Sequence, residues 1–307
     1  MSFLWRLVPF CRKLWYASCR RHHMNIVKRN SVLIIYTVCI LLMAAGTFLD
    51  QTISKFVFND TNKICIFLAA VGEWPMMLNG WISAGLLYAA LPDKKDKFGY
   101  YLCIGLMACG ILGGCIALLD IKEMYSGSKL IMCMAGEIIL AGLCAFGAYK
   151  FADRSDLGLI RRTAIFLLFT VAFTAIFITA LKIPWARPRY SYIRSTEGLQ
   201  FQKWYKIGSA QKAAFGSTLD HEAFKSFPSG HTGFSTTLLA TAGICGVIPA
   251  FREKEYIFSF IAMILIIVIA ASRIVMGAHF LTDVTFAFML VYTITAILYK
   301  VLKVDEY

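Results

Sequence analysis

Residues 257–276 read IFSFIAMILIIVIAASRIVM, a run of apolar residues interrupted by one charge, Arg273. A helix of about 20 apolar residues crosses the hydrocarbon core of a bilayer, so this run predicts a transmembrane helix. The composition of the whole chain agrees, because 59% of its 307 residues are hydrophobic and only 16% are charged. Soluble domains carry about 25% charged residues. We therefore expect an all-α fold, a polytopic transmembrane helical bundle.

Working outward from this run, we find about eight candidate membrane segments. They cover approximately residues 31–50, 76–92, 100–119, 129–150, 162–182, 231–249, 257–276 and 280–299. Segment 76–92 is short and contains Asn79, so whether it spans fully stays open. Between the first two segments, residues 51–75 mix apolar and charged side chains, which predicts an amphipathic helix at the outer surface.

The distribution of Lys and Arg predicts the orientation. With a cytoplasmic N-terminus, more than half of the 31 Lys and Arg fall at inner ends of segments, as the positive-inside rule requires. We expect a multi-pass protein of the cell membrane with both termini cytoplasmic. The chain then divides into a basic, interfacial segment 1–30, membrane helices in 31–159, and a C-terminal core in 160–307. Within this core, the polar residues 183–230 form an outer loop.

Several other classes of protein are disfavoured. The net charge is +13, but no nucleic-acid recognition motif accompanies it, so we expect no nucleic-acid partner. The ten cysteines include no CxxC pair and fall mostly in apolar runs, which speaks against a disulfide framework or a zinc site. Residues 1–30 lack the pattern of a cleaved signal; a basic helix on the inner membrane surface and a disordered tail both stay open.

Three stretches at predicted outer helix ends carry the residues of most chemical interest. The first runs from Lys182 through Arg187 and Arg189 to Tyr190, and the second is Pro228-Ser229-Gly230-His231. The third comprises Ser272, Arg273, His279 and Asp283. By the parity of the segments, all three lie on the same outer face, so they can meet in one pocket.

Two histidines in these stretches suit acid–base and nucleophilic chemistry. Asp283 follows His279 by four residues, so both project from one helix face. A carboxylate on one ring nitrogen fixes the tautomer and leaves the other nitrogen free to attack. His231 is then the candidate that protonates a leaving oxygen. A lone histidine would more often be structural, but neither of these is alone.

The remaining residues suit a phosphoryl group. Lys182, Arg189 and Arg273 gather positive charge, which stabilises the negative oxygens of a phosphoryl transition state. Ser229 and Gly230 precede a predicted helix, so their backbone N–H groups can donate to an anion.

Taken together, these residues resemble the three signature motifs of the type 2 phosphatidic acid phosphatase superfamily, in particular bacterial membrane lipid phosphatases related to vanadium haloperoxidases. The motifs are Lys, six residues, Arg-Pro; Pro-Ser-Gly-His; and Ser-Arg, five residues, His, three residues, Asp. The second and third match in full. In the first, Lys182 and Arg189 keep the spacing, but Tyr190 stands where the family has Pro. Arg187 forms an Arg-Pro pair two residues early, and its role stays open.

The resemblance, which covers about residues 160–300, implies a phosphatase core. By it, Lys182, Arg189, Arg273, Ser229 and Gly230 bind phosphate. The catalytic residues it implies are His279 as nucleophile, Asp283 as its orienting group and His231 as acid.

The resemblance also implies a substrate class and excludes cofactors. It implies a lipid phosphate or pyrophosphate substrate, with no metal or other cofactor and no obligate protein partner. Candidates are undecaprenyl pyrophosphate, which we favour by family analogy, phosphatidic acid and phosphatidylglycerol phosphate. A lipid phosphotransferase using the same site is the alternative. A transporter, in which the intramembrane charges mark a pathway, is a third hypothesis.

Overall fold

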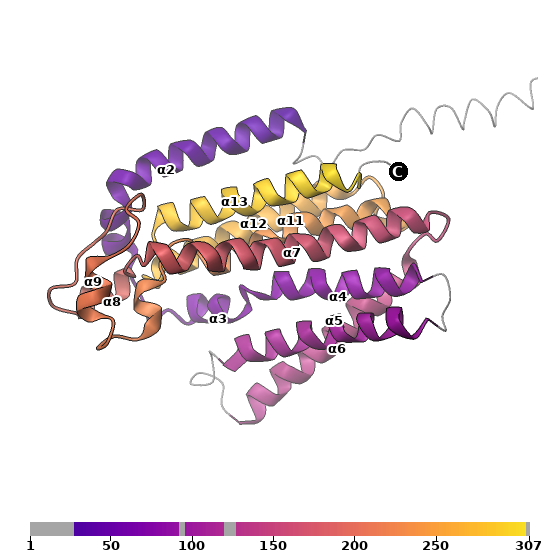
Figure 1. The fold of residues 1–307 in the computed structure, drawn as a ribbon, viewed down its shortest axis with the longest axis horizontal. Helices are drawn as coiled ribbons and strands as arrows, with labels where there is room; N and C mark the ends of the chain where they lie inside the picture. The colour runs from indigo at the N-terminus through magenta and orange to yellow at the C-terminus, as the bar shows by residue number, and fades with distance from the viewer. Residues whose placement is uncertain (1–27, 92–95, 120–126, 305–307) are drawn as a thin grey trace, which may run out of the picture.

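The structure is a computed structural model that describes residues 28–91, 96–119 and 127–304. Every regular element in these ranges is a helix, which confirms the predicted all-α class (Figure 1). The basic segment predicted over residues 1–30 lies almost entirely outside the described residues.

Long helices form the body of the molecule, and short elements connect α7 to α12. The helices of the body are α2 (Arg29–Val57), α3 (Lys63–Val71), α4 (Trp74–Ala89), α5 (Lys97–Leu119), α6 (Ser128–Phe151), α7 (Leu157–Trp185), α12 (Glu255–Val275) and α13 (Leu281–Val301). The short elements are α8 (Tyr190–Ser195), α9 (Ala210–Phe215), η2 (His221–Phe224), α10 (Gly230–Thr236), α11 (Leu238–Thr241), η3 (Ala242–Gly246) and η4 (Pro249–Phe251).

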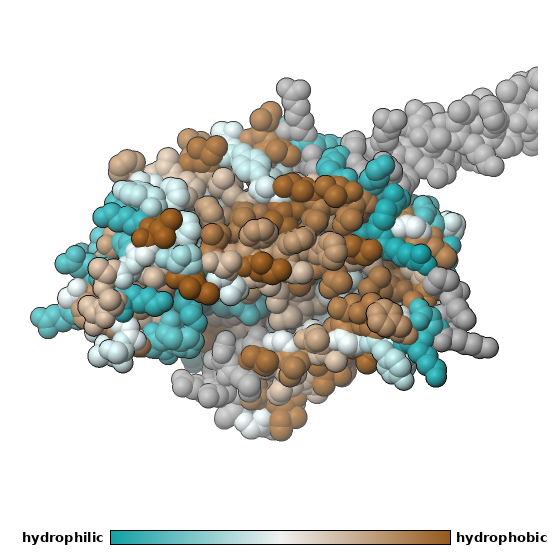
Figure 2. Space-filling model, viewed as in Figure 1, coloured by the Kyte–Doolittle hydropathy of each residue, from teal (hydrophilic) through white to brown (hydrophobic). Residues whose placement is uncertain are grey.

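Seven helical segments in the described ranges are long and apolar enough to cross a membrane. Large apolar side chains on them point outward; Phe56, for example, is 91% exposed. In Figure 2, hydrophobic residues cover the middle of the molecule and hydrophilic residues gather at its two ends. A helix satisfies its own backbone hydrogen bonds, so such a bundle can present an apolar belt to lipid. This arrangement indicates a multi-pass membrane protein.

The prediction for residues 51–75 is wrong. Helix α2 continues to Val57 instead of ending near residue 50, and α3 packs against α12 rather than lying apart at the surface. Helices α3 and α4 together form one candidate span from Lys63 to Ala89. The charged Lys63 and Glu73 suggested an amphipathic helix, but they flank an apolar α3 at its two ends.

The predicted segment 231–249 is not one continuous helix. It is divided into α10, α11 and η3, because small and hydroxyl residues compete for the backbone. The hydroxyls of Ser235 and Thr236 both donate to the carbonyl of Thr232. Most residues of this stretch are buried, and irregular backbone at membrane depth is tolerated where protein shields it from lipid.

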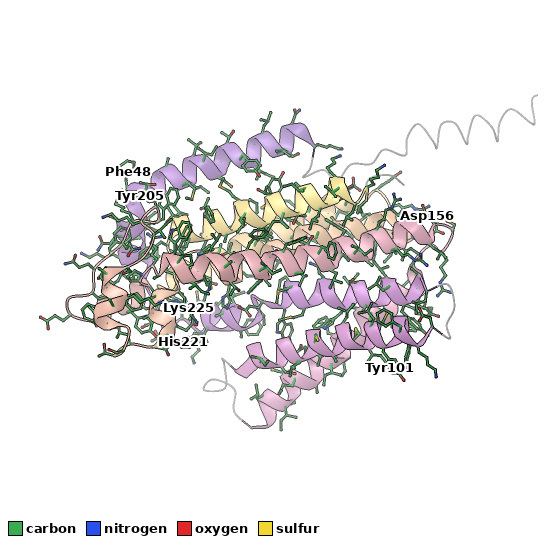
Figure 3. The ribbon with its side chains drawn as sticks, viewed as in Figure 1. Phe48, Tyr101, Asp156, Tyr205, His221 and Lys225 are labelled. Atoms are coloured by element: carbon green, nitrogen blue, oxygen red, sulfur yellow. The ribbon has the colours of Figure 1, made fainter. Side chains whose placement is uncertain are left out.

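The irregular segment lies inside the bundle, where α10 contacts α4, α7, α12 and α13. Helix α2 packs along α13 on one side, and α5 and α6 pair beyond α4 on the other (Figure 1). The residues between α7 and α10 lie together at one end, which we call the loop end. Figure 3 labels His221 and Lys225 there and Asp156 at the opposite end.

Candidate active site

The loop end brings together the three stretches singled out in the sequence. The backbone N–H of Ser229 donates to the carbonyl oxygen of Asp283 at 3.2 Å, which joins the second stretch to the third. A Cβ placed on Gly230 would lie 3.2 Å from Nζ of Lys182, which brings in the first. Lys182, Arg189 and Arg273 all act electrostatically on His279.

His279 is buried, with only 1% of the residue exposed, and lies in the turn between α12 and α13. Its Nδ1 is 2.5 Å from the carbonyl oxygen of Ser226. A carbonyl only accepts, so Nδ1 carries the proton and Nε2 keeps its lone pair. Burial, and then the charges of Arg189, Lys182 and Arg273, hold the pKa of His279 well below its ordinary value. The ring is therefore a neutral imidazole with a free Nε2, as a nucleophile requires.

Asp283 lies on the predicted helix face but is not bonded directly to the imidazole. Its Oδ2 is 4.0 Å from Nδ1 of His279. The same oxygen accepts from the hydroxyl of Ser226 at 2.6 Å and from the backbone N–H of Phe280 at 2.8 Å. Ser226 thus bridges Asp283 and His279: its hydroxyl donates to the Asp283 carboxylate, and its backbone carbonyl accepts from the His279 ring. Sequence reasoning missed Ser226, because a backbone carbonyl leaves no signature in a sequence.

Three cations, Lys182, Arg189 and Arg273, act on His279. Arg273 is 6% exposed and its Nη1 lies 3.7 Å from the sulfur of Met276. Arg189 forms an ion pair with Glu222, which also accepts from Nζ of Lys225 at 2.8 Å. Burial tends to raise the pKa of Glu222, but the Lys225 hydrogen bond and the Arg189 charge outweigh it and hold that pKa below its usual value. Glu222 is a further residue that the sequence did not single out.

Ser229 differs from its predicted role. Its side chain caps α10 by accepting from the N–H of Thr232, and its own N–H is engaged by Asp283. In this structure the Ser229 N–H is therefore directed to Asp283, and the phosphate contact of Ser229 stays a prediction. Gly230 lies beside Lys182, where a side chain would enter the space near the ammonium group, and its contact with phosphate stays a prediction.

Residues 163–306 match the family model of the PAP2 superfamily. These residues form a C-terminal PAP2 domain. This family is the superfamily that the motifs resemble, so the recognition from sequence is confirmed at the level of the superfamily. Comparisons with curated proteins and with solved structures gave no match.

Within the PAP2 domain, Arg187 is held by protein groups on every side. It is fully buried, and its guanidinium donates to Asp50 at 2.9 Å, to Asp283, to Thr282 Oγ1 at 2.9 Å and to the Gln202 carbonyl at 2.8 Å. All three of its nitrogens are thus engaged by protein groups, which leaves Arg189 as the arginine of the first motif that faces the site.

Helix α2 reaches the PAP2 domain through Asp50, which lies outside the matched residues. One oxygen of Asp50 accepts from the N–H of Thr282 at 3.0 Å, and the other accepts from its hydroxyl at 2.5 Å. Tyr190, which replaces the family proline, packs edge-on against Phe58 and Phe280. It therefore contributes to the same anchoring of α2.

His231 opens α10 of the PAP2 domain and is partly buried. Its Nε2 is 2.8 Å from the carbonyl oxygen of Ala69, and its Nδ1 is 3.7 Å from Oε1 of Glu73. Both partners belong to the α3–α4 segment, so the N-terminal helices line the site as well. Across residues 28–91, 96–119 and 127–304, no group of three or more His, Cys, Asp or Glu side chains is placed to hold a metal ion.

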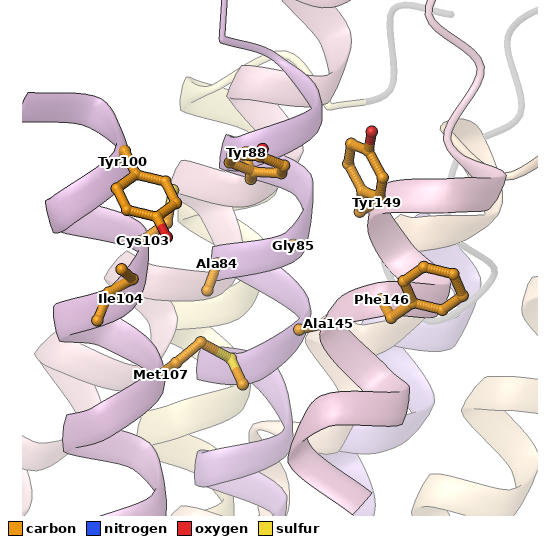
Figure 4. Close-up of a pocket in the computed structure, with 10 residues that line it drawn as sticks. All are labelled: Ala84, Gly85, Tyr88, Tyr100, Cys103, Ile104, Met107, Ala145, Phe146 and Tyr149. Atoms are coloured by element: carbon orange, nitrogen blue, oxygen red, sulfur yellow. The ribbon is translucent and has the colours of Figure 1, made fainter. Parts of the chain in front are cut away.

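A cavity of about 360 Å³ between α4, α5 and α6 is separate from this site (Figure 4). Tyr88 lies 15 residues along the chain from Glu73, a separation of about 22 Å at the helical rise of 1.5 Å per residue. The cavity is lined by Ala84, Gly85, Tyr88, Tyr100, Cys103, Ile104, Met107, Ala145, Phe146 and Tyr149. It offers apolar and aromatic surface and no charged side chain, so it does not suit phosphate chemistry.

Proposed function

We propose that this protein is a membrane phosphatase that removes phosphate from a lipid phosphate or pyrophosphate through a phosphohistidine on His279. The single observation that carries the proposal is the state of the His279 ring. It is buried and neutral, with Nδ1 donating to Ser226 and Nε2 free, and it lies in the field of Lys182, Arg189 and Arg273.

In the first step, Nε2 of His279 attacks phosphorus and the bond from phosphorus to the leaving oxygen breaks. The three cations stabilise the charge on the equatorial oxygens. His231 gives a proton to the leaving oxygen. The hydrogen bond from Nδ1 to the Ser226 carbonyl supports the positive charge that the ring gains, and Asp283 holds Ser226 in place.

In the second step, a water molecule attacks the phosphohistidine and gives its proton to the now neutral His231. The N–P bond breaks, and inorganic phosphate and the original His279 are released. A lipid acceptor in place of water would make the protein a phosphotransferase. That alternative shares every residue, so only the identity of the product distinguishes it.

The membrane arrangement favours a lipid substrate. The site lies at the loop end of a bundle with an apolar outer belt, where a headgroup can reach His279 while its tails stay in hydrocarbon. We further propose that both termini are cytoplasmic and the loop end is extracytoplasmic, following the basic residues of the opposite end. A Glu197→Cys variant in the loop would then react with a membrane-impermeant thiol reagent in intact cells.

The experiment is phosphate release by the purified protein from undecaprenyl pyrophosphate, phosphatidic acid and phosphatidylglycerol phosphate, with EDTA present. We expect release by the wild type and its loss in His279→Ala and His231→Ala. Rapid quenching at alkaline pH should trap phosphate on the wild type but not on His279→Ala. A requirement for a divalent cation, or full activity of His279→Ala, would contradict the proposal.

A further inference from the structure

The break between α3 and α4 lies directly against His231. Ala69 is in the last turn of α3, and its carbonyl only accepts, so the 2.8 Å contact places the ring proton on Nε2 of His231. This leaves Nδ1 as the nitrogen that can exchange a proton with substrate. That nitrogen is 3.7 Å from Oε1 of Glu73, the residue that directly precedes α4.

Close packing holds the break in this position. A Cβ added to Gly72 would lie 2.8 Å from the carbonyl oxygen of Leu68, 3.1 Å from Cδ2 of His231 and 3.2 Å from Cγ2 of Ile269. No side chain fits there without moving the break away from the ring. Glycine at position 72 therefore lets the backbone, and Glu73 with it, approach the imidazole.

The location and charge of Glu73 also point to a role in the site. It lies within the candidate span Lys63–Ala89, and an ionisable residue inside a membrane segment points by default to function. The charge of Glu73 also acts on Lys182, so the carboxylate faces the same cluster of cations as the proposed phosphate.

Four charged groups act on His231 from the elements packed around it. Arg273 approaches from α12, Lys182 from α7, Arg189 from the segment after α7, and Glu73 from the α3–α4 break. Burial, and then the three cations, hold the pKa of His231 well below its ordinary value, yet a general acid must carry its proton before the leaving oxygen departs. Among these four groups, Glu73 is the only one that favours the protonated ring.

We propose that Glu73 is a positioning residue that orients His231 and keeps the transferable proton on its Nδ1. This inference rests on the proposed phosphatase function. As the bond to the leaving oxygen breaks, the Nδ1 proton moves to that oxygen. In the second step, Nδ1 takes a proton from the attacking water, and Glu73 stays ionised throughout. Glu73 precedes the matched residues 163–306, so the N-terminal helices would supply part of the acid–base machinery.

The test compares two leaving groups in Glu73→Gln, a change that keeps the shape of the side chain and removes its charge. With a lipid phosphate, whose alkoxide leaves poorly, we expect phosphorylation of the enzyme to slow by about 10- to 100-fold, within the usual contribution of general acid catalysis. With p-nitrophenyl phosphate, whose leaving group needs no proton, the burst of p-nitrophenol should change less than about threefold.

The pH profile gives a second readout. Loss of the carboxylate makes the His231 imidazolium less favourable, so the basic limb of lipid phosphate turnover should move to lower pH. Glu73→Asp should restore part of the rate. Glu197→Gln, an exposed carboxylate of the loop, is the matched control and should leave both substrates and the profile unchanged.

Three results would overturn the inference. These are an equal loss with both leaving groups, an unmoved pH profile, or wild-type rates in Glu73→Gln. Gel filtration and thermal unfolding of each variant in detergent establish that it is folded. A wild type that releases no phosphate, or an active His279→Ala, would instead remove the proposed function itself. The two failures are therefore distinguishable.

Discussion

Replacing Arg187 by Met tests whether this residue holds the site together rather than binding phosphate. The side chain is fully buried, and its two ion-pair partners, Asp50 and Asp283, are 1% and 0% exposed. Removing one partner of a buried ion pair costs about 3–5 kcal/mol, because the remaining charge has no compensation. Here two carboxylates would be left. We therefore expect at least this loss, against a total stability of about 5–15 kcal/mol for a typical protein.

A second substitution tests the cause of that loss. In Arg187→Met combined with Asp50→Asn, one stranded charge is removed, while a side-chain oxygen at position 50 can still accept from Thr282. We expect the double variant to recover about 1–3 kcal/mol relative to Arg187→Met, in the range of couplings between contacting residues. Denaturation in detergent micelles, followed by tryptophan fluorescence, measures both differences.

Arg189→Met is the matched comparison. Its side chain is 15% exposed and pairs with Glu222, which is 37% exposed and keeps Lys225 as a second partner. Removing Arg189 therefore leaves no carboxylate without a partner, and the cost should be close to that of surface pairs, about 0–1 kcal/mol. The Arg189→Met variant should therefore keep a stability within about 1 kcal/mol of wild type. Its phosphate release should fall by about 10²–10³-fold, as it does when an enzyme loses one donor to the transition state. A stable but inactive Arg187→Met would refute the reasoning, since it would give Arg187 the role that we assign to Arg189.

Other changes test single contacts of the site. Ser226→Ala removes the hydroxyl that donates to Asp283 and should cost about 1.5–3 kcal/mol of stability, with a measurable fall in phosphate release. Gly230→Ala should reduce release at least tenfold without unfolding the protein, because its Cβ would lie 3.2 Å from Nζ of Lys182. Vanadate, which mimics five-coordinate phosphorus, should inhibit turnover, and normal rates in excess vanadate would contradict the mechanism. Because the pKa of His279 is well below its ordinary value of about 6.5, its phosphorylation in a single turnover should persist below pH 6.5. The unfolded chain takes up a proton there that the native ring does not, so stability should fall as pH falls.

The sequence predicted the fold class and most long helices because hydrophobic run length is a strong local signal. It failed at residues 231–249, where hydrophobicity suggested one helix but glycines and hydroxyl residues divide the backbone. The sequence-based prediction was also wrong at residues 51–75, where charged residues such as Lys63 and Glu73 among apolar ones suggested an amphipathic helix. These charges lie at helix ends, and only tertiary packing distinguishes the two cases.

The candidate site could be predicted as far as its side chains have recognised roles and fixed spacing. His279, Asp283 and Lys182 were found in this way, and the structure brings them together. The contacts that connect them could not be found, because they use backbone groups and long-range partners. The Ser226 carbonyl on His279 and the Ala69 carbonyl on His231 are of this kind. Arg189 keeps the spacing of the first motif, whereas Arg187 supplies its Arg-Pro pair, and burial distinguishes the two residues.

Some of these contacts also cross the predicted boundary at residue 160 between the N-terminal helices and the C-terminal core. The PAP2 match begins at residue 163, yet Asp50 anchors the start of α13, and the α3–α4 segment carries both contacts to His231. A chain beginning at residue 160 would leave Arg187 with one carboxylate fewer and Nε2 of His231 without its acceptor. The N-terminal helices therefore contact the proposed site, and we expect the matched region on its own to lack the proposed activity.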